Sequence, residues 1–417
     1  MFAKFNKITL ENGLAVYHIP VNLGSDVISV DLFYDVGSKD EVMGKSGIAH
    51  MLEHLNFKST KNRKAGEFDA IVKGFGGVNN ASTGFDFTHY FIKCERSNLA
   101  TCLDLYADIM ENLKLEESEF LPERNVVLEE RLWRTDNDPF GYLFFRLYNS
   151  AFVYHPYHWT PIGFRSDIEG WKIEDIREFH AKFYNPNNAA LLISGDIDEK
   201  SAFELAKKSF SHIKNRCEKS HVCAPEPEQD GARFNLIHKD SHVQIVATAF
   251  KIPPFNHADA ASINALCDYL GGMKSSLLQR ILVDEKKLAN QIDVYNLASK
   301  HENLMIIFGV CNAGVAGERL RDEIFAILEN AKNSQISDDE ITKLKNSAKS
   351  SLIYSMDSAS KVASIYGSYI IRGDLDALFR LQSDIENISA QNLNETMKKY
   401  LKFKNSTTLI LRKEDDE

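Results

Sequence analysis

The alternation of hydrophobic and polar positions divides the chain into short strands and amphipathic helices. In residues 27–34, large apolar side chains occupy every second position, as in a strand with one buried face. Similar patterns predict two strands around an Asn-Gly turn in 10–17, or one strand with a bulge at Gly13, and further strands at 78–83, 88–92 and 189–195. Apolar residues with helical spacing predict helices at 98–113 and 118–133.

The clearest helical pattern lies in residues 47–55, Gly-Ile-Ala-His-Met-Leu-Glu-His-Leu. As a helix, this segment places its four large apolar residues on one stripe that faces a core. His50, Glu53 and His54 then share the opposite face. Ser46 precedes the pattern, and we expect it to cap the helix.

The polar face of this helix has the residue types of a metal site. Two imidazoles one turn apart can bind one metal ion, and a carboxylate between them can reach a water in the open coordination position. The order His-x-x-Glu-His is typical of one class of zinc peptidases. The alternative is a solvated helix face, because three such residues also meet by chance. A catalytic zinc needs a third protein ligand from elsewhere in the chain.

The predicted helix at 118–133 carries two carboxylates on one face. Ser118 is its expected cap, and Glu123 and Glu130 follow two turns apart from each other. Such a pair is more often surface decoration on a partly apolar helix. It gains a function only if this face meets the histidine-bearing helix.

The second half of the chain repeats the order of elements in the first half, which indicates a duplication. A polar, proline-containing stretch separates the halves, so we predict domains at 1–215 and 232–417 and a linker at 216–231. The second half is predicted to contain strands at 243–250, 292–297, 304–310 and 407–411, and helices at 257–270, 317–331 and 338–354. Its counterpart of the histidine-bearing helix, 261–268, has no metal ligands, so only the first half is expected to carry chemistry.

Composition narrows the class of protein. The 417 residues are 44% hydrophobic and 26% charged, which is typical of a soluble globular protein with two or more domains. A formal net charge of −10 argues against a nucleic acid partner. No segment has the apolar length of a signal peptide or a membrane span, so we expect neither. Six scattered cysteines without a C-x-x-C pair predict free thiols and a cytoplasmic location.

Several of these segments together resemble a known family. In order along the chain, the similar segments are Asn12-Gly13-Leu14, Gly-Ser-Lys-Asp-Glu at 37–41, 47–54, Phe57-Lys58, 80–83 and 123–130. They resemble the pitrilysin, insulin-degrading and mitochondrial-processing-peptidase family of zinc metallopeptidases, the inverzincins, over essentially the whole chain. The resemblance implies an α+β fold of two homologous domains, each a mostly antiparallel sheet flanked by helices, that form a clam-shell chamber.

The resemblance also implies the members of a zinc site. The family's third zinc ligand is a glutamate far downstream of the second histidine, and its position here is Glu130. Zn²⁺ would therefore be held by His50, His54 and Glu130, with water in the remaining position. Glu123 would be the carboxylate that orients a ligand. Glu53 would take a proton from the water and pass it to the leaving amine.

The resemblance implies a substrate as well. Asn80, Ala81, Ser82 and Thr83 are similar to the family's edge strand, on which a peptide is laid by strand addition. Such binding contacts the peptide backbone more than its side chains. The implied function is that of a zinc-dependent endopeptidase that cleaves unstructured peptides inside an enclosed chamber.

One departure from the family pattern bears on partners. Alignment on 270–277 and Leu288-Ala289 brings Val283 and Asn290 to positions where active members usually carry Arg and Tyr. Those side chains stabilise the developing oxyanion, which Val283 cannot do. We therefore expect a metal-bearing subunit of a heterodimer whose homologous partner supplies Arg and Tyr, with a homodimer as the alternative. A further alternative is a non-catalytic structural or assembly subunit, against which an intact Glu53 and an intact Glu130 argue.

Overall fold

The computed structural model describes residues 2–218 and 224–413 and divides them into two compact units. Unit 1 contains the described residues of 1–131, 159–223 and 352–379. Unit 2 contains those of 132–158, 224–351 and 380–417. The part of the predicted linker at 219–223 lies outside the described residues.

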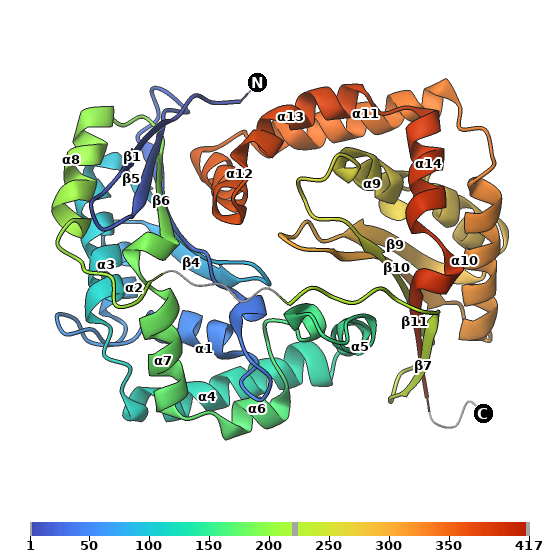
Figure 1. Cartoon of the computed structure of the whole chain (residues 1–417), viewed down its shortest axis with the longest axis horizontal. Coiled ribbons are helices and arrows are strands. Elements are labelled where there is room, and N and C mark those ends of the chain that lie inside the picture. Colours follow the sequence, from blue (N-terminus) through green and yellow to red (C-terminus); the bar gives the residue numbers. More distant parts are fainter. Residues whose placement is uncertain (1, 219–223, 414–417) are drawn as a thin grey trace. The chain divides into compact units, whose positions relative to one another are not determined.

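Unit 1 is built on a six-stranded sheet (Figure 1). Only the pairing of β2 with β6 is parallel, and all other neighbours are antiparallel. β4 pairs with β5 alone and therefore forms one edge of the sheet. The spatial order of the strands is β1 (Asn6–Thr9), β2 (Ala15–Ile19), β6 (Ala189–Ser194), β3 (Val27–Tyr34), β5 (Thr88–Glu95) and β4 (Val78–Thr83).

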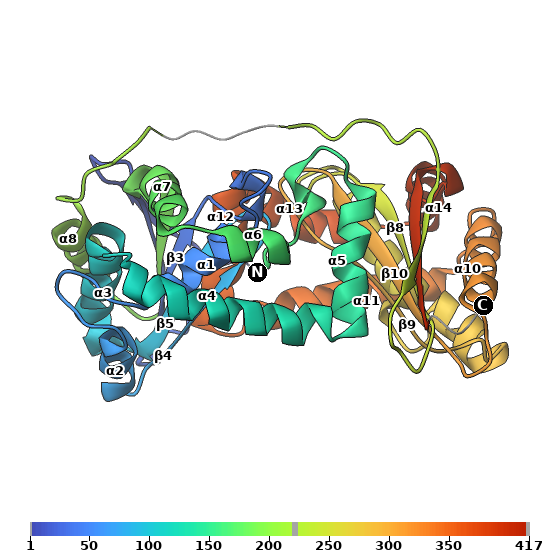
Figure 2. The same ribbon diagram turned by 90° about the horizontal axis from the view of Figure 1, so that it is seen from below.

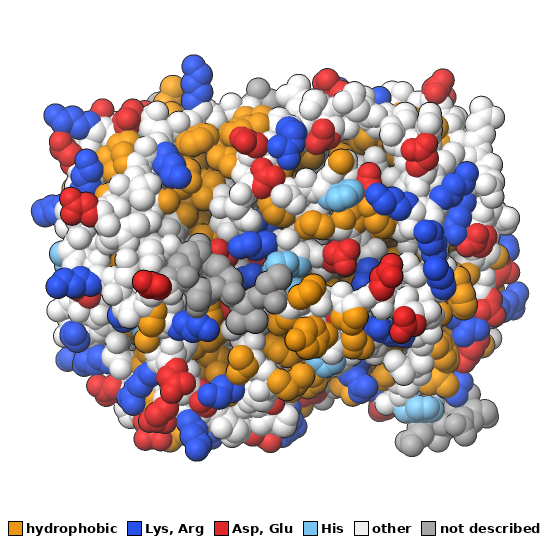
Figure 3. All heavy atoms as spheres, viewed as in Figure 1, with side chains coloured by type: hydrophobic (Ala, Val, Ile, Leu, Met, Phe, Trp, Pro, Cys, Tyr) orange, Lys and Arg blue, Asp and Glu red, His pale blue; other side chains and the backbone are white. Residues whose placement is uncertain are grey.

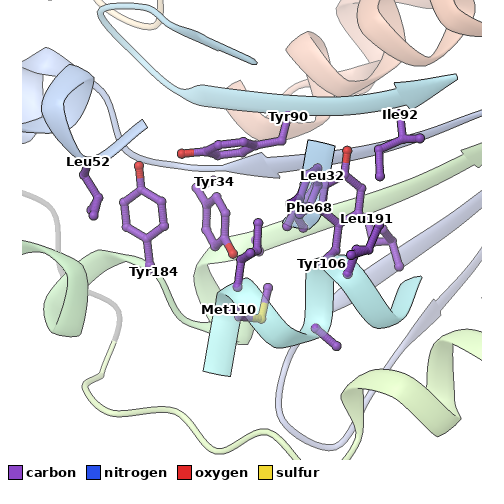
Figure 4. Packing of buried hydrophobic residues seen from close by; sticks show 14 of the residues in the cluster. Leu32, Tyr34, Leu52, Phe68, Tyr90, Ile92, Tyr106, Met110, Tyr184 and Leu191 are labelled. Atoms are coloured by element: carbon purple, nitrogen blue, oxygen red, sulfur yellow. The ribbon is translucent and has the colours of Figure 1, made fainter. Parts of the chain in front are cut away.

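Helices cover both faces of this sheet. On one face, residues such as Leu32, Tyr34 and Tyr90 pack into a large core with the helices (Figure 4). These helices include α1 (Ile48–Leu55), α2 (Glu67–Gly74), α3 (Leu99–Asn112), α4 (Glu117–Arg131), α7 (Ile173–Phe183) and α8 (Glu199–Phe210), with the short α6 (Arg165–Gly170) beside α4. On the other face, α12 (Ala359–Arg372) packs against β3 and β6. A Cβ at Gly367 would lie 2.1 Å from the Phe33 ring, so glycine permits this close approach.

The five-stranded sheet of unit 2 repeats the order and directions of five of the six strands of unit 1, all but β1, which confirms the predicted duplication. Only β7 and β11 are parallel, as β2 and β6 are in unit 1. The order is β7 (Arg233–His238), β11 (Ser406–Arg412), β8 (Ile245–Ile252), β10 (Asn303–Cys311) and β9 (Ala289–Asn296). Its helices include α5 (Pro139–Ala151), α9 (Ala260–Cys267), α10 (Gly317–Ala331), α11 (Asp338–Tyr354) and α14 (Ala390–Tyr400), and α13 (Leu375–Glu386) runs from one unit to the other.

The compact units differ from the predicted domains 1–215 and 232–417 in two exchanged segments. Residues 132–158 come from the first half, yet α5 within them packs against β8 and β11 of unit 2. Residues 352–379 come from the second half, yet α12 covers the sheet of unit 1. A hydrophobic pattern shows that a helix has an apolar face but not which sheet that face covers, so the exchange could not be predicted.

The surface of the structure carries charged side chains of both signs, as the composition leads us to expect (Figure 3). Acidic and basic side chains are interspersed on the face shown in Figure 3, so no patch of a single sign dominates it. Within the described residues, none of the helices combines the length and the apolar character that a membrane span requires.

Candidate metal centre

Helix α1 presents the histidines because its other face is buried. Ile48, Met51, Leu52 and Leu55 are at most 2% exposed and join the core of unit 1. The opposite face, with the two histidines and the intervening glutamate, is only half-buried. The predicted helix and the division of its faces are therefore confirmed.

The start of α1 is fixed by a glycine and a buried carboxylate. Gly47 has a φ of 89°, and a Cβ there would lie 2.8 Å from the carbonyl oxygen of Ile162. The carboxylate of Glu41 accepts hydrogen bonds of 2.8 Å from the backbone N–H groups of Gly47 and Ala49. Burial raises the pKa of Glu41, although these two hydrogen bonds oppose the shift. The predicted cap, Ser46, is wrong, because its hydroxyl donates instead to Asp167.

Helix α4 brings the second carboxylate pair to α1. It packs against α1, and Figure 2 shows the two helices side by side. Buried Arg131 ends α4 and donates a hydrogen bond to the carbonyl of Gly163. Ser118 lies inside the first turn of α4, so its prediction as a cap is wrong. The helix begins at Glu117, one residue before Ser118. The carboxylates of Glu117 and Glu119 in its first turn interact favourably with the positive end of the helix dipole.

Three ligand atoms of the predicted set meet between α1 and α4. Oε2 of Glu130 lies 3.6 Å from Nε2 of His50 and 3.4 Å from Nε2 of His54. All three ligand atoms lie within 4.8 Å of one another, and no other cluster of this kind occurs in the described part of the chain. Two bonds of about 2.0–2.1 Å at a tetrahedral angle separate ligand atoms by about 3.4 Å. The side chains therefore fit a tetrahedral zinc ion.

Glu123 contacts the far side of the His54 ring. Its Oε1 lies 2.8 Å from Nδ1 of His54, and its Oε2 lies 2.6 Å from Nζ of Lys58. An acceptor at Nδ1 favours the tautomer whose Nε2 lone pair faces Glu130. The hydrogen bond from His54 lowers the pKa of Glu123, with help from Lys58.

The pKa of His54 reflects the same contacts in the metal-free chain. Burial alone would lower it. Hydrogen bonds to Glu123 and Glu130 outweigh burial and raise the pKa of His54 to about 9. A proton therefore occupies this ring near neutral pH until a metal ion displaces it.

Glu53 lies next to the ligands and is held by the edge strand. The hydroxyl of Thr83, the last residue of β4, donates a hydrogen bond to Oε2 of Glu53 at 2.5 Å. β4 pairs only with β5, so its other edge has no neighbouring strand. Its residues Asn80, Ala81 and Ser82 are exposed or half-buried. The strand is thus placed as predicted, and its binding of substrate stays a prediction.

Sequence patterns missed Glu41 and Lys58 as supports of this centre. Residues 38–41 are all polar or charged in the sequence, yet they are at most 6% exposed in the structure. The signals for Lys58 were its place in the family-like segment Phe57-Lys58 and its position one turn after His54. In unit 2, Val283 lies half-buried in a π-helical segment and Asn290 is exposed in β9.

Comparisons with known protein families match both halves of the chain. A family model described as insulinase (peptidase family M16) matches residues 21–155. A second model, described as the peptidase M16 inactive domain, matches residues 170–348. The first match contains all three candidate ligands, and the second covers the strands β7 to β10 of unit 2.

Individual relatives cover nearly the whole chain. The zinc protease PqqE of Helicobacter pylori is 48% identical over 413 residues, which are 98% of this chain and 93% of that protein. A probable mitochondrial-processing peptidase subunit beta of Arabidopsis thaliana is 27% identical over 94% of this chain and 75% of its own. Cytochrome b-c1 complex subunit 1 of Rattus norvegicus is 26% identical over 94% of this chain and 82% of its own.

A solved structure supports the same likeness. The crystal structure of a protease from Helicobacter pylori matches with a TM-score of 0.96 at 47% identity, and the match covers 99% of this chain and 100% of that one. The α+β fold with two similar domains is therefore shared with that protease.

Proposed function

The chain belongs to the M16 family of peptidases, and from this premise we propose that it is a zinc-dependent endopeptidase. The observation that carries the proposal is the meeting of the ligand atoms of His50, His54 and Glu130 within 4.8 Å of one another, with Glu53 beside them. The zinc protease name of its relative with 48% identity supports the same metal. An intact ligand set together with an intact candidate base favours catalysis.

Each residue of the centre has a distinct part in the proposed reaction. His50, His54 and Glu130 would hold the zinc ion, and Glu123 would keep His54 oriented through Nδ1. A bound zinc ion supplies Lewis acidity, which polarises the scissile carbonyl and acidifies water. Glu53 would accept the proton of the attacking water and return it to the leaving amine nitrogen.

The proposed substrate is an extended peptide on the edge strand β4. The unpaired side of β4 offers backbone N–H and C=O groups to an added strand. Because Thr83 at the end of β4 contacts Glu53, such a peptide would run past the proposed base. Unstructured peptides satisfy this requirement, whereas a stably folded domain does not expose an extended segment. Enclosure of the peptide in a chamber remains a prediction.

We propose further that this chain is the metal-bearing subunit of a dimer. Val283 lacks a hydrogen-bond donor in its side chain, and Asn290 has a short one, where active members of the family usually carry Arg and Tyr. Each donor directed at an oxyanion contributes about 3–4 kcal/mol to transition-state stabilisation. A homologous partner that keeps both residues should therefore raise turnover on mixing. Equal activity with and without it would favour a self-sufficient homodimer.

The competing function is that of a non-catalytic assembly subunit. The rat relative with 26% identity is named as a subunit of the cytochrome b-c1 complex and not as a protease. Metal content separates the two functions, because an assembly subunit does not need a zinc ion.

The test is hydrolysis of a quenched fluorescent peptide by purified chain whose zinc content is measured. We expect one zinc ion per chain and cleavage that a chelator abolishes and added zinc restores. The matched control is His54→Ala, which should lose both zinc and cleavage. A chain without zinc, or a zinc-loaded chain inactive both alone and with the partner, would favour the assembly function.

A further inference from the structure

A cavity of about 380 Å³ adjoins the candidate metal centre in unit 1. It lies between α1, α2 and the start of β4, all within the same unit. A peptide laid along β4 toward Glu53 would therefore direct a side chain into it. The cavity is lined by Glu53, His54, Phe57, Lys58, Asp69, Lys73, Asn79, Asn80 and Glu123.

Most charged groups that line the cavity already have partners within it. Glu123 binds His54 and the ammonium of Lys58. Asp69 accepts a hydrogen bond of 2.8 Å from the side-chain amide of Asn79. Glu53 accepts a hydrogen bond from the hydroxyl of Thr83 at the end of β4.

Lys73 is the exception in this lining. Among the residues that the structure describes, its ammonium makes neither an ion pair nor a hydrogen bond. Lys73 lies in the last turn of α2, one turn after Asp69. The half-buried ring of Phe57 gives the cavity an apolar wall, and this ring packs edge-on against Phe68. A residue with an apolar stem and an anionic end matches both features.

We propose that Lys73 makes this cavity a subsite for a carboxylate of the substrate peptide, an inference that rests on the proposed function. The carboxylate comes from an acidic side chain next to the scissile bond or from a peptide C-terminus. An ion pair accessible to solvent changes affinity by about two- to fivefold. Asp69 on the same helix face keeps the preference at this modest size, since it repels the same group.

The first experiment compares amidated peptides that differ only in Glu, Gln or Lys on either side of the cleaved bond. They compete for the zinc-loaded chain, and the products are quantified by mass spectrometry. The wild type should prefer Glu over Gln by about two- to fivefold, and Lys73→Glu should shift the Glu-to-Lys ratio by about tenfold toward Lys. Lys207→Glu, at an exposed position of α8 outside the cavity, is the control and should keep the wild-type ratio.

The second arm distinguishes the two sources of the carboxylate. A preference that persists in amidated peptides assigns an acidic side chain, and one that requires a free C-terminus assigns the terminal carboxylate. Cleavage without any dependence on charge, or a ratio that Lys73→Glu leaves unchanged, would overturn the subsite but not the peptidase.

If the zinc-loaded chain cleaves none of the peptides, either alone or mixed with the homologous partner, the proposed function fails, and binding then decides the subsite. The affinities of the same peptides for the chain are measured by fluorescence anisotropy. They should follow the order Glu, Gln, Lys in the wild type and reverse in Lys73→Glu. Equal affinities for the three peptides would overturn the inference.

Discussion

Replacing Glu123 should weaken zinc binding although Glu123 is not itself a ligand. Its Oε1 accepts the hydrogen bond from Nδ1 of His54 at 2.8 Å, and its side chain is 12% exposed, so water shields the contact little. A hydrogen bond to a charged group contributes about 1.5–3 kcal/mol, which corresponds to about a 10- to 100-fold change in an equilibrium constant. Glu123→Ala should lower zinc affinity by about that factor. Glu123→Gln keeps an acceptor and should lose less.

The assay is competition for zinc between the chain and a chromophoric chelator. Glu119 on the same helix is the matched control, because its carboxylate accepts from Ser59 rather than from a ligand. Glu119→Gln should keep the wild-type zinc affinity. An unchanged affinity in Glu123→Ala would refute the reasoning, since His54 would then hold its orientation without this hydrogen bond.

The remaining predictions concern the proton on His54 and the hydroxyl on Thr83. Because the pKa of His54 is raised from 6.5 to about 9 in the metal-free chain, zinc must displace a proton. Zinc affinity should therefore rise by about tenfold per pH unit until about pH 9 and then level off, and calorimetry in buffers of different ionisation enthalpy should detect the released proton. The same shift stabilises the metal-free chain below about pH 6.5, and this stability should be lost as pH rises through about 9. Thr83→Val should lower kcat by about tenfold or more with zinc retained, Thr83→Ser should restore it, and the neighbouring Ser82→Ala should have little effect.

Much of the fold could be predicted where the hydrophobic pattern is regular. Helices α10 and α11 begin and end at the predicted residues, and the strands predicted at 78–83 and 88–92 form β4 and β5, which pair with each other. Residues 359–400, for which no element is predicted from the sequence, form the helices α12, α13 and α14. β7 was also missed, since its side chains are mostly exposed.

The candidate site was predictable only in part from local spacing. The division of α1 into an apolar and a polar face follows from helical geometry alone, and the structure confirms it. The approach of Glu130 to His54 is a contact between two distant helices, so only the family resemblance indicated it. The cap at Glu41 was missed because a carboxylate six residues before Gly47 reaches the helix through a buried loop.

The most direct test of the account is the hydrolysis rate of Glu53→Gln, with zinc measured in the same samples. The substitution keeps the size of the side chain and leaves the three candidate ligands intact. We predict wild-type zinc content and a rate lower by about 10²- to 10⁴-fold, because the base is lost while the metal stays. A variant that binds zinc and cleaves the peptide at nearly the wild-type rate would contradict the account.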